Sequence, residues 1–485
     1  MTYFLGVDIG TASSKGVLVD AYETVVRSSA REHAVDRPHP GHVEMDGEIW
    51  WREFVSLAAE LTDGVTVSAV GVSGMGPCVL LTSVSEKPLR PAILYGVDTR
   101  ATEQIEALTT ELGGADAIRQ RCGSALSSQA VGPKLAWLAR HEPATFAASK
   151  RLFMPASWLA YRLTGEYVLD YHSASQCTPL FDTHALDWYR PWSDLIAPDL
   201  ELPPLRWPGD VAGTTQVPLA GIPAGTPVIT GTIDAWTEAV SVGAQRPGDL
   251  MLMYGTTMFL IATVDRPVTS PSMWGTVGAF PGTRNLAGGM ATSGAITGWL
   301  RDLTGASYEE LIAEASGPGA NGLLMLPYFA GERTPIMDPD ARGVIAGLTL
   351  SHTRGDLYRA ALEATAFGVR HNVDALSSAN IEIKRTIAVG GGTRGGLWTR
   401  IVSDVTGLTQ IVPRVTIGAS YGAAFLAANV DHRRDIDDWN PAAETISPDI
   451  SEKSFYDSLY ASYRDLYPAT RTIAHSLATR QRRTT

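Results

Sequence analysis

Tyr3-Phe-Leu-Gly-Val-Asp-Ile-Gly-Thr-Ala-Ser-Ser-Lys-Gly-Val-Leu-Val-Asp20 is the segment from which the architecture can be inferred. Two β-rich runs flank the turn Gly-Thr-Ala-Ser-Ser, which predicts a hairpin. The turn is small enough for its backbone amides to face an anion. Composition alone favours an ordinary hairpin, but Asp8 is an acid inside an otherwise apolar strand beside the turn. A buried carboxylate needs a partner, and a hydrated Mg²⁺ next to phosphate groups would supply one.

A second segment repeats this pattern, at Asp249-Leu-Met-Leu-Met-Tyr-Gly-Thr-Thr-Met-Phe-Leu-Ile-Ala-Thr-Val-Asp265. Again two apolar runs flank a Gly-Thr turn. A chain of 485 residues is too long for one ordinary core. We therefore predict a duplicated α/β fold with a nucleotide between its halves. The boundary is expected near Gly243-Ala-Gln-Arg-Pro-Gly248, which gives domains at residues 1–245 and 246–485.

The segment from Thr230 to Val240 contains the candidate catalytic residue, Asp234. The apolar run Pro227-Val-Ile229 predicts a strand, and a helix is expected to begin at or just after Asp234. This places one carboxylate at the carboxyl end of a strand, where open α/β sheets bind ligands and where an Asp can accept a proton from a hydroxyl. Taken alone, the segment favours a simpler role in which Asp234 caps the helix.

Composition excludes several classes of function. Hydrophobic residues make up 45% and charged residues 19% of the chain, and the net charge is −12. This acidic balance argues against nonspecific binding to nucleic acid or anionic membranes and favours a small-molecule substrate. The three cysteines are far apart, which indicates neither a zinc site nor a disulfide framework. With no signal peptide and no run long enough to span a bilayer, we expect a cytoplasmic protein, and a homodimer is the assembly that we consider.

Two further segments predict structure around a ligand. Thr353-Arg-Gly-Asp356 predicts the capped start of a helix running to about Leu376. The run Thr386-Ile-Ala-Val-Gly-Gly-Gly-Thr-Arg-Gly-Gly-Leu-Trp398 predicts a buried strand that breaks into a glycine-rich turn. It satisfies the dinucleotide pattern G-x-G-x-x-G, but Asp404 follows too closely for the ribose-binding acid of that motif. We interpret the glycines as clearing space for a purine or its ribose.

Taken together, these segments resemble the FGGY carbohydrate kinases, a branch of the actin and Hsp70-like ATPase superfamily. The most specific match is Gly343-Val-Ile-Ala-Gly-Leu348, followed after seven residues by Asp356-Leu-Tyr-Arg-Ala-Ala-Leu-Glu363. Other expected parts occur in order along the chain: Asp8-Ile-Gly-Thr11, Gly231-Thr-Ile-Asp234, Tyr254-Gly-Thr-Thr257, Gly331-Glu-Arg-Thr-Pro335, Gly390-Gly-Gly392 and Gly422-Ala-Ala424. The resemblance covers nearly the whole chain, and within the family it is greatest to the xylulokinases.

The resemblance implies two ribonuclease H-like domains, with ATP and a sugar in the cleft between them. It also implies that Asp234 is similar to the family's catalytic base and Asp8 to the acid that positions Mg²⁺. The residues implied in binding the nucleotide and its phosphates are Gly10, Thr11, Lys15, Gly255, Thr256, Thr257, Gly294, Gly391 and Gly392.

Departures from the xylulokinase pattern occur on the sugar side. Xylulokinases have Gly-Gln-Met-His-Gly where this chain has Gly74-Met-Gly-Pro-Cys78, so the substrate-contacting His is missing. Their Trp-Asn-Asp-Gly-Arg corresponds to the longer Tyr95-Gly-Val-Asp-Thr-Arg100, and the Asn that usually follows the base is Ala235. A site built to bond a given hydroxyl rejects analogues that lack it, and losing the partner removes that selection. We therefore predict a kinase for a ketose such as xylulose, or for a related ketose or polyol.

Met75, Asp98 and Trp236 are the candidate substrate residues, although Asp98 and Arg100 fit a surface ion pair or a helix start equally well. Two other functions are alternatives to a kinase. Asp234 and Glu238 could form an i, i+4 carboxylate pair of the kind a glycosidase uses, but the two Gly-Thr turns would then have no role. The alternative from another class is a non-catalytic ATP- and sugar-binding clamp or sensor, which has no need of a base.

Overall fold

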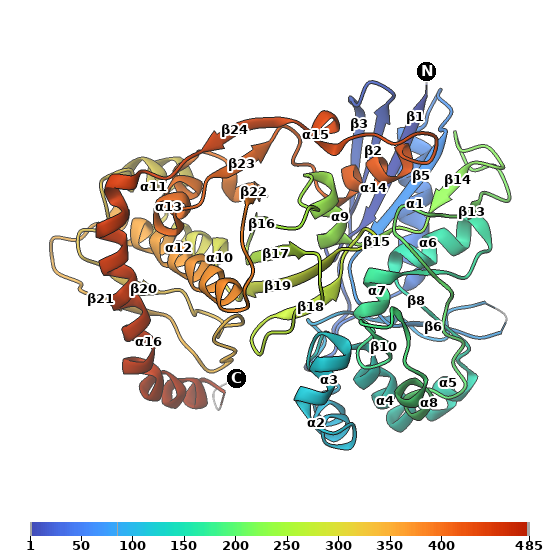
Figure 1. The fold of residues 1–485 in the computed structure, drawn as a ribbon, viewed down its shortest axis with the longest axis horizontal. Coiled ribbons are helices and arrows are strands. Elements are labelled where there is room, and N and C mark those ends of the chain that lie inside the picture. Colours follow the sequence, from blue (N-terminus) through green and yellow to red (C-terminus); the bar gives the residue numbers. More distant parts are fainter. Residues whose placement is uncertain (1, 85, 483–485) are drawn as a thin grey trace.

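The computed structural model describes residues 2–84 and 86–482, and it divides into two halves, each built on a seven-stranded sheet. Figure 1 shows the first half at the right and the second at the left. The first sheet has the order β13-β14-β5-β1-β2-β3, with β15 paired to β5. Its strands are β1 (Tyr3–Ile9), β2 (Ser13–Asp20), β3 (Val25–Glu32), β5 (Ala69–Gly74), β13 (Val211–Thr214), β14 (Pro227–Ile229) and β15 (Thr232–Ile233).

The second sheet has the order β18-β19-β17-β16-β22-β23-β24. Its strands are β16 (Asp249–Tyr254), β17 (Met258–Val264), β18 (Trp274–Val277), β19 (Arg284–Met290), β22 (Arg385–Val389), β23 (Gln410–Pro413) and β24 (Ala442–Ile446). In both halves an antiparallel hairpin (β1–β2, β16–β17) lies beside a parallel strand (β5, β22). The predicted hairpins are therefore confirmed, and they occupy corresponding places in the two sheets.

Short paired strands and helices complete the chain. The pairs are β4 (Glu44–Met45) with β7 (Ala92–Ile93), β6 (Leu80–Thr82) with β8 (Arg151–Phe153), β9 (Leu169–Asp170) with β12 (Leu205–Arg206), β10 (Phe181–Asp182) with β11 (Asp187–Trp188), and β20 (Leu324–Leu326) with β21 (Val344–Ala346). The first-half helices are α1 (Gly47–Leu61), α2 (Thr102–Glu111), α3 (Ala115–Cys122), α4 (Val131–His141), α5 (Pro143–Ala148), α6 (Pro155–Thr164), α7 (Tyr171–Ser175), α8 (Arg190–Ile196) and α9 (Asp234–Ser241). The second-half helices are α10 (Gly294–Thr304), α11 (Tyr308–Glu314), α12 (Arg354–Ser378), α13 (Leu397–Thr406), α14 (Ala419–Ala428), α15 (Ile436–Trp439) and α16 (Lys453–Gln481).

Helix α12 begins as its sequence predicts. Thr353 accepts a hydrogen bond from the backbone N–H of Asp356, whose carboxylate in turn accepts from the N–H of Thr353. This reciprocal cap satisfies two amides that the first helical turn leaves without partners. The helix then runs through the core of the second half to Ser378.

Helix α14 lies beyond residue 246 and yet packs on the first sheet, against β1, β5 and α9 (Figure 1). Its small residues allow this close approach. A Cβ added at Gly6 would lie 2.0 Å from the Ser420 carbonyl oxygen, and one at Gly71 would lie 2.0 Å from the Ala423 carbonyl oxygen. The two halves are thus joined by a returning helix as well as by the connection between α9 and β16.

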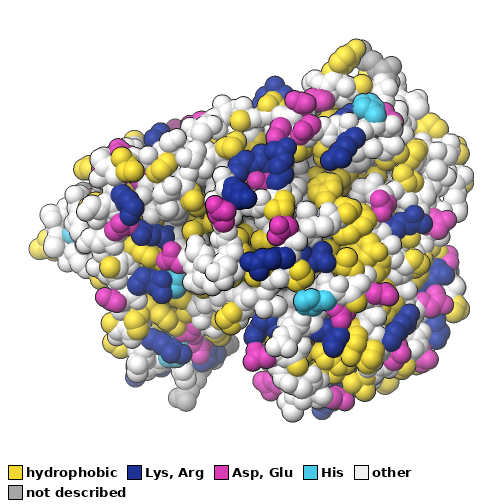
Figure 2. Space-filling view, viewed as in Figure 1, with side chains coloured by type: hydrophobic (Ala, Val, Ile, Leu, Met, Phe, Trp, Pro, Cys, Tyr) yellow, Lys and Arg dark blue, Asp and Glu magenta, His cyan; other side chains and the backbone are white. Residues whose placement is uncertain are grey.

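Acidic and basic side chains are interspersed over the face shown in Figure 2. None of the helices in the described residues is both long and apolar enough to cross a bilayer.

Candidate active site

Asp234 is the first residue of α9, directly after β15, as its sequence predicts. It does not act as the cap: Ile233 holds the N-cap position, and among the described residues the Asp234 carboxylate accepts only the neighbouring amide of Ala235, at 2.7 Å. Burial raises the pKa of Asp234, although the hydrogen bond from Ala235 lowers it. A carboxylate with a raised pKa is a stronger proton acceptor than an exposed one.

Two other carboxylates lie near Asp234, and one ammonium group lies near those two. Burial, followed by the charge of Asp234, raises the pKa of Asp8, and the same two causes raise the pKa of Glu238 to about 7. Lys15 opposes both shifts. It is the residue opposite Asp8 in the β1–β2 hairpin, so the register of this hairpin places the two together.

The Asp8 carboxylate has an oxygen, Oδ1, that is buried and has no hydrogen-bond partner among the described residues. A buried charge without a partner is costly, and Mg²⁺ prefers oxygen ligands while keeping several of its waters. No group of three or more His, Cys, Asp or Glu side chains in the described part of the chain forms a complete ligand set. The unpartnered Oδ1 makes Asp8 the residue here that fits such a cation.

The two Gly-Thr turns lie on opposite halves. Gly10 donates its N–H to the Ser13 carbonyl, and the Thr11 hydroxyl lies 2.8 Å from the Tyr95 hydroxyl. In the second turn the Gly255 N–H donates to the Thr257 carbonyl at 3.1 Å.

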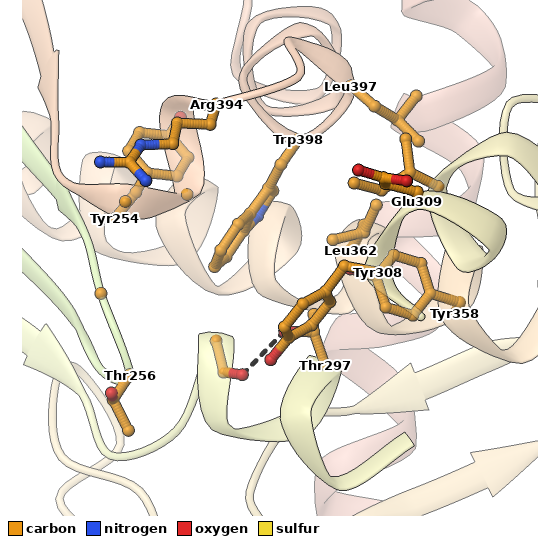
Figure 3. A pocket seen from close by; sticks show the side chains of 15 residues that line it. Tyr254, Thr256, Thr297, Tyr308, Glu309, Tyr358, Leu362, Arg394, Leu397 and Trp398 are labelled. Carbon is orange, nitrogen blue, oxygen red and sulfur yellow. Dashed lines mark hydrogen bonds between the residues drawn. The ribbon is translucent and has the colours of Figure 1, made fainter. Parts of the chain in front are cut away.

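A cavity of about 790 Å³ lies within the second half (Figure 3). It is lined by Gly255 and Thr256 of the turn, by Gly294 at the start of α10, and by Gly391 and Gly392 after β22. Figure 3 shows the Trp398 ring near the middle of the lining side chains, with Thr256 at the lower left. We name it the second-half cavity; it brings together five of the residues predicted to bind the nucleotide, and its size suits a nucleotide.

A smaller cavity of about 220 Å³ contains Asp234 and is lined by both halves. We name it the Asp234 cavity. Its remaining first-half walls are Gly76, Pro77, Tyr95, Ser124, Ala125, Ser127, Gln129, Ala130, Gln176, Thr178, Ile233, Ala235 and Trp236. Its second-half walls are Met253, Thr257, Phe259, Trp274 and Arg333.

Of the three predicted substrate residues, only Trp236 lines the Asp234 cavity. Met75 is fully buried in the core of the first half. Asp98 is buried, accepts a hydrogen bond from the Val43 N–H and forms a buried ion pair with Arg100. The structure thus places Asp98 and Arg100 in an ion pair that is neither on the surface nor in the cavity.

Several residues that line the Asp234 cavity could not be predicted from the sequence. Gln129, Gln176, Phe259 and Trp274 carry no motif or periodicity that distinguishes them from core or loop residues. Arg333 lies in the charged loop Gly331-Glu-Arg-Thr-Pro335, so a signal existed for this residue. The two changed positions Pro77 and Ala235 do line the cavity, which places these departures beside the candidate base.

Comparison with known proteins agrees with this arrangement. Residues 3–241 match the N-terminal domain and residues 250–429 the C-terminal domain of the FGGY family of carbohydrate kinases. Xylulose kinase of Escherichia coli strain K12 is 30% identical, over 96% of this chain and 98% of its own. Glycerol kinase 2 of Streptomyces avermitilis is 32% identical, over 96% and 94%. The crystal structure of xylulose kinase from Rhodospirillum rubrum superimposes with a TM-score of 0.90 at 32% identity, covering 98% of this chain and 100% of that one.

These matches extend over almost the entire chain, and the fold is the two-domain α/β architecture of the actin-like ATPases. The chain belongs to the FGGY family of carbohydrate kinases, and among them it is xylulokinase-like.

Proposed function

We propose that this carbohydrate kinase transfers the terminal phosphoryl group of ATP to a hydroxyl of a small sugar or polyol, with Asp234 as the general base. The observation that carries the proposal is the position of Asp234: a buried carboxylate of raised pKa faces a cavity that also receives Thr257 of a Gly-Thr turn. Phosphoryl transfer requires the acceptor oxygen, the phosphorus and the base to be held in line, and this arrangement supports it.

Each half contributes a different task. The second-half cavity would hold the adenosine, because its walls combine aromatic rings with glycines that leave room for a ligand. The threonines of the two turns, Thr11, Thr256 and Thr257, would direct backbone amides and hydroxyls at the phosphates, since the Gly10 and Gly255 amides are used within the turns. Asp234 would orient the acceptor hydroxyl and take its proton as the new O–P bond forms and the bond to ADP breaks.

Asp8, with its unpartnered Oδ1, is the residue that would position Mg²⁺, either directly or through water. A bound Mg²⁺ would offset negative charge on the phosphates. Before the nucleotide binds, the positive charge of Lys15 would offset part of the negative charge of Asp8 and Glu238.

The substrate is proposed to be a ketose or polyol that need not be xylulose. Relatives of this chain are named for xylulose and for glycerol, so the family match leaves the acceptor open. In this chain Pro77 and Ala235 offer no side-chain hydrogen bond at the Asp234 cavity.

Replacement of the base tests the mechanism. In the Asp234→Asn variant we expect kcat to fall at least about a hundredfold, because general-base catalysis supplies about that much, while the sugar still binds. Coupled ADP release across ketoses, aldoses and polyols measures turnover, and thermal shift measures binding. In the unchanged protein kcat/KM should rise with pH through a pKa above 3.8, since only the ionised carboxylate accepts the proton.

The same experiment decides between a kinase and a sensor. If no sugar raises ADP release above the basal rate and sugars still shift the melting temperature, the non-catalytic clamp is supported. Full turnover by Asp234→Asn would show that another group is the base.

A further inference from the structure

The side chain of His33 contacts the backbone of the first Gly-Thr turn. His33 comes directly after β3, and its backbone N–H donates to the carbonyl of Ala12 in the turn at 3.1 Å. Its side chain is only 5% exposed, and the ring nitrogen Nε2 lies 3.0 Å from the Gly10 carbonyl oxygen. A carbonyl oxygen only accepts hydrogen bonds, so Nε2 must carry the hydrogen of this contact.

Glu53, on α1, binds the other nitrogen of the same ring. Its Oε2 lies 2.8 Å from Nδ1 of His33 and also accepts the hydroxyl of Ser14 at 2.5 Å. The hydrogen bond at one nitrogen of a histidine sets the orientation and the role of the other. The ring of His33 is therefore held in one orientation, with Nε2 directed at Gly10.

Fixing the Gly10 carbonyl also fixes the direction of the next amide. The peptide bond between Gly10 and Thr11 is trans, so the Gly10 C=O and the Thr11 N–H point in opposite directions. The Thr11 N–H donates to no described residue. The Thr11 hydroxyl contacts the hydroxyl of Tyr95, which lines the Asp234 cavity. The Thr11 amide is thus an unpaired donor that lies near this cavity and points away from His33.

The second Gly-Thr turn has the same arrangement with different donors. The Gly255 carbonyl accepts the hydroxyl of Ser293 at 3.0 Å and the N–H of Gly294 at 3.1 Å. The N–H of Thr256 has no acceptor among the described residues. In each half, then, the glycine carbonyl is anchored and the following threonine amide is left for a ligand. Because the anchoring groups differ while the outcome is the same, the contact of His33 with Gly10 is better explained by the task of the turn than by packing alone.

We propose that His33 is a positioning residue for phosphoryl transfer: its Nε2–H holds the Gly10 carbonyl so that the Thr11 amide donates to the terminal phosphate of ATP. This inference rests on the proposed kinase function and adds a residue to it. The adenosine is assigned to the second-half cavity, so the first turn, on the other half, would meet the end of the nucleotide that is transferred. An amide that is already oriented stabilises charge on the phosphoryl oxygens without having to reorganise. His33 acts through the peptide and does not touch the reacting atoms.

Nucleotides with and without the terminal phosphate test this role. Isothermal titration should compare ADP with the β,γ-imido analogue of ATP, both with Mg²⁺, in the unchanged protein and in His33→Phe, which keeps a ring but has no Nε2 donor. We expect the dissociation constant of the analogue to rise about tenfold, because a hydrogen bond to a charged group is misaligned, and that of ADP to stay within about threefold. Equal weakening of both nucleotides, or weakening of neither, would overturn the assignment.

Kinetics and a conservative variant separate positioning from a structural role. In His33→Phe, kcat for an acceptor that the unchanged protein phosphorylates should fall about tenfold, and KM for that acceptor should stay within about threefold. His33→Gln should recover most of kcat, because its amide nitrogen can still donate to the Gly10 carbonyl. A His33→Gln protein as impaired as His33→Phe would count against the proposal.

His184→Phe is the matched control. Nε2 of His184 also lies 2.9 Å from a backbone carbonyl oxygen, that of Gln120, but neither residue is among those described as lining the two cavities. If His33→Phe does not fold, Glu53→Leu makes the same comparison, since it removes the group that holds Nδ1, and the analogue should again be weakened more than ADP. Absence of turnover with every acceptor would end the kinase proposal, whereas the comparison of the two nucleotides needs no turnover and still decides whether His33 acts on the terminal phosphate.

Discussion

At the residue scale, neighbouring glycines of the second-half cavity have different surroundings. A Cβ added at Gly391 would meet nothing within 4 Å, whereas one at Gly392 would lie 2.6 Å from the Trp398 ring. Both residues line the cavity, so only the first can be enlarged without disturbing its walls.

We therefore expect Gly391→Val to fill space that the nucleotide needs. The dissociation constant of this variant for ADP should rise about tenfold or more, which is a loss of about 1.4 kcal/mol of binding free energy. The melting temperature of the ligand-free variant should be unchanged. Gly392→Ala should lower the melting temperature as well, because Trp398 must move. Isothermal titration and thermal unfolding check this pair, and unchanged ADP binding by Gly391→Val would mean that the nucleotide lies elsewhere.

Glu332 makes stability depend on pH. Its carboxylate is buried beside Arg333, and burial raises its pKa to about 8 although two backbone N–H groups lower it. The folded form therefore holds this proton more tightly than the unfolded form. The stabilising contribution is complete below pH 4.5 and is lost as pH rises through about 8.

We expect the Glu332 contribution to lower the free energy of unfolding as pH rises from 4.5 to about 8. The Glu332→Gln variant should show a smaller decrease over the same range. The Gln carbonyl can still accept the two N–H groups, so the variant should be the more stable protein at high pH. Urea titrations at several pH values measure this, with exposed Glu106→Gln as the control. A slope that is unchanged in Glu332→Gln would assign the pH dependence to other groups.

At the scale of elements, α14 depends on glycines in the strands beneath it. The Gly71 Cα lies so near the Ala423 carbonyl that even a methyl group would overlap it, at 2.0 Å. Gly71→Ala must therefore separate α14 from β5, and overpacking of this kind costs about 1–3 kcal/mol or more. Urea denaturation should show this loss, whereas Gly317→Ala, which has open space around it, should be near neutral. Equal stability of the two variants would mean that α14 shifts freely.

Some of these elements could be predicted from the sequence, and others could not. Both Gly-Thr hairpins, the start of α9 at Asp234 and the cap of α12 were predicted, because turn residues and alternation are local signals. The packing of α14 on the first sheet was not, since it depends on contacts between residues more than 300 positions apart, such as Gly71 and Ala423. The prediction that Asp98 contacts the substrate was wrong for a similar reason. Its spacing in the sequence does not show that the Arg100 side chain folds back to form a buried ion pair with it.

At the scale of the whole molecule, the two cavities differ in which half forms them. The second-half cavity is lined only by residues from Tyr254 to Trp398, among those described. The Asp234 cavity takes walls from both halves, with Asp234 and Gln176 from one and Thr257 and Arg333 from the other. A ligand in the second-half cavity contacts residues of the second half and gives the first half no reason to move. A ligand at Asp234 contacts residues of both halves and can therefore bring them together.

It follows that the acceptor substrate, more than the nucleotide, should close the cleft. We expect the radius of gyration in solution scattering to fall when the acceptor sugar or polyol is added alone, and to change less with ADP alone. Hydrogen exchange should slow in parallel at the loop from Gly331 to Pro335, because Arg333 of that loop is one of the second-half walls of the Asp234 cavity. Trp274→Ala removes one wall from the second half, so it should weaken compaction by the substrate while leaving ADP binding unchanged. Compaction by ADP alone, equal to that with substrate, would show instead that the nucleotide reaches across to the first half through the turn at Gly10 and Thr11.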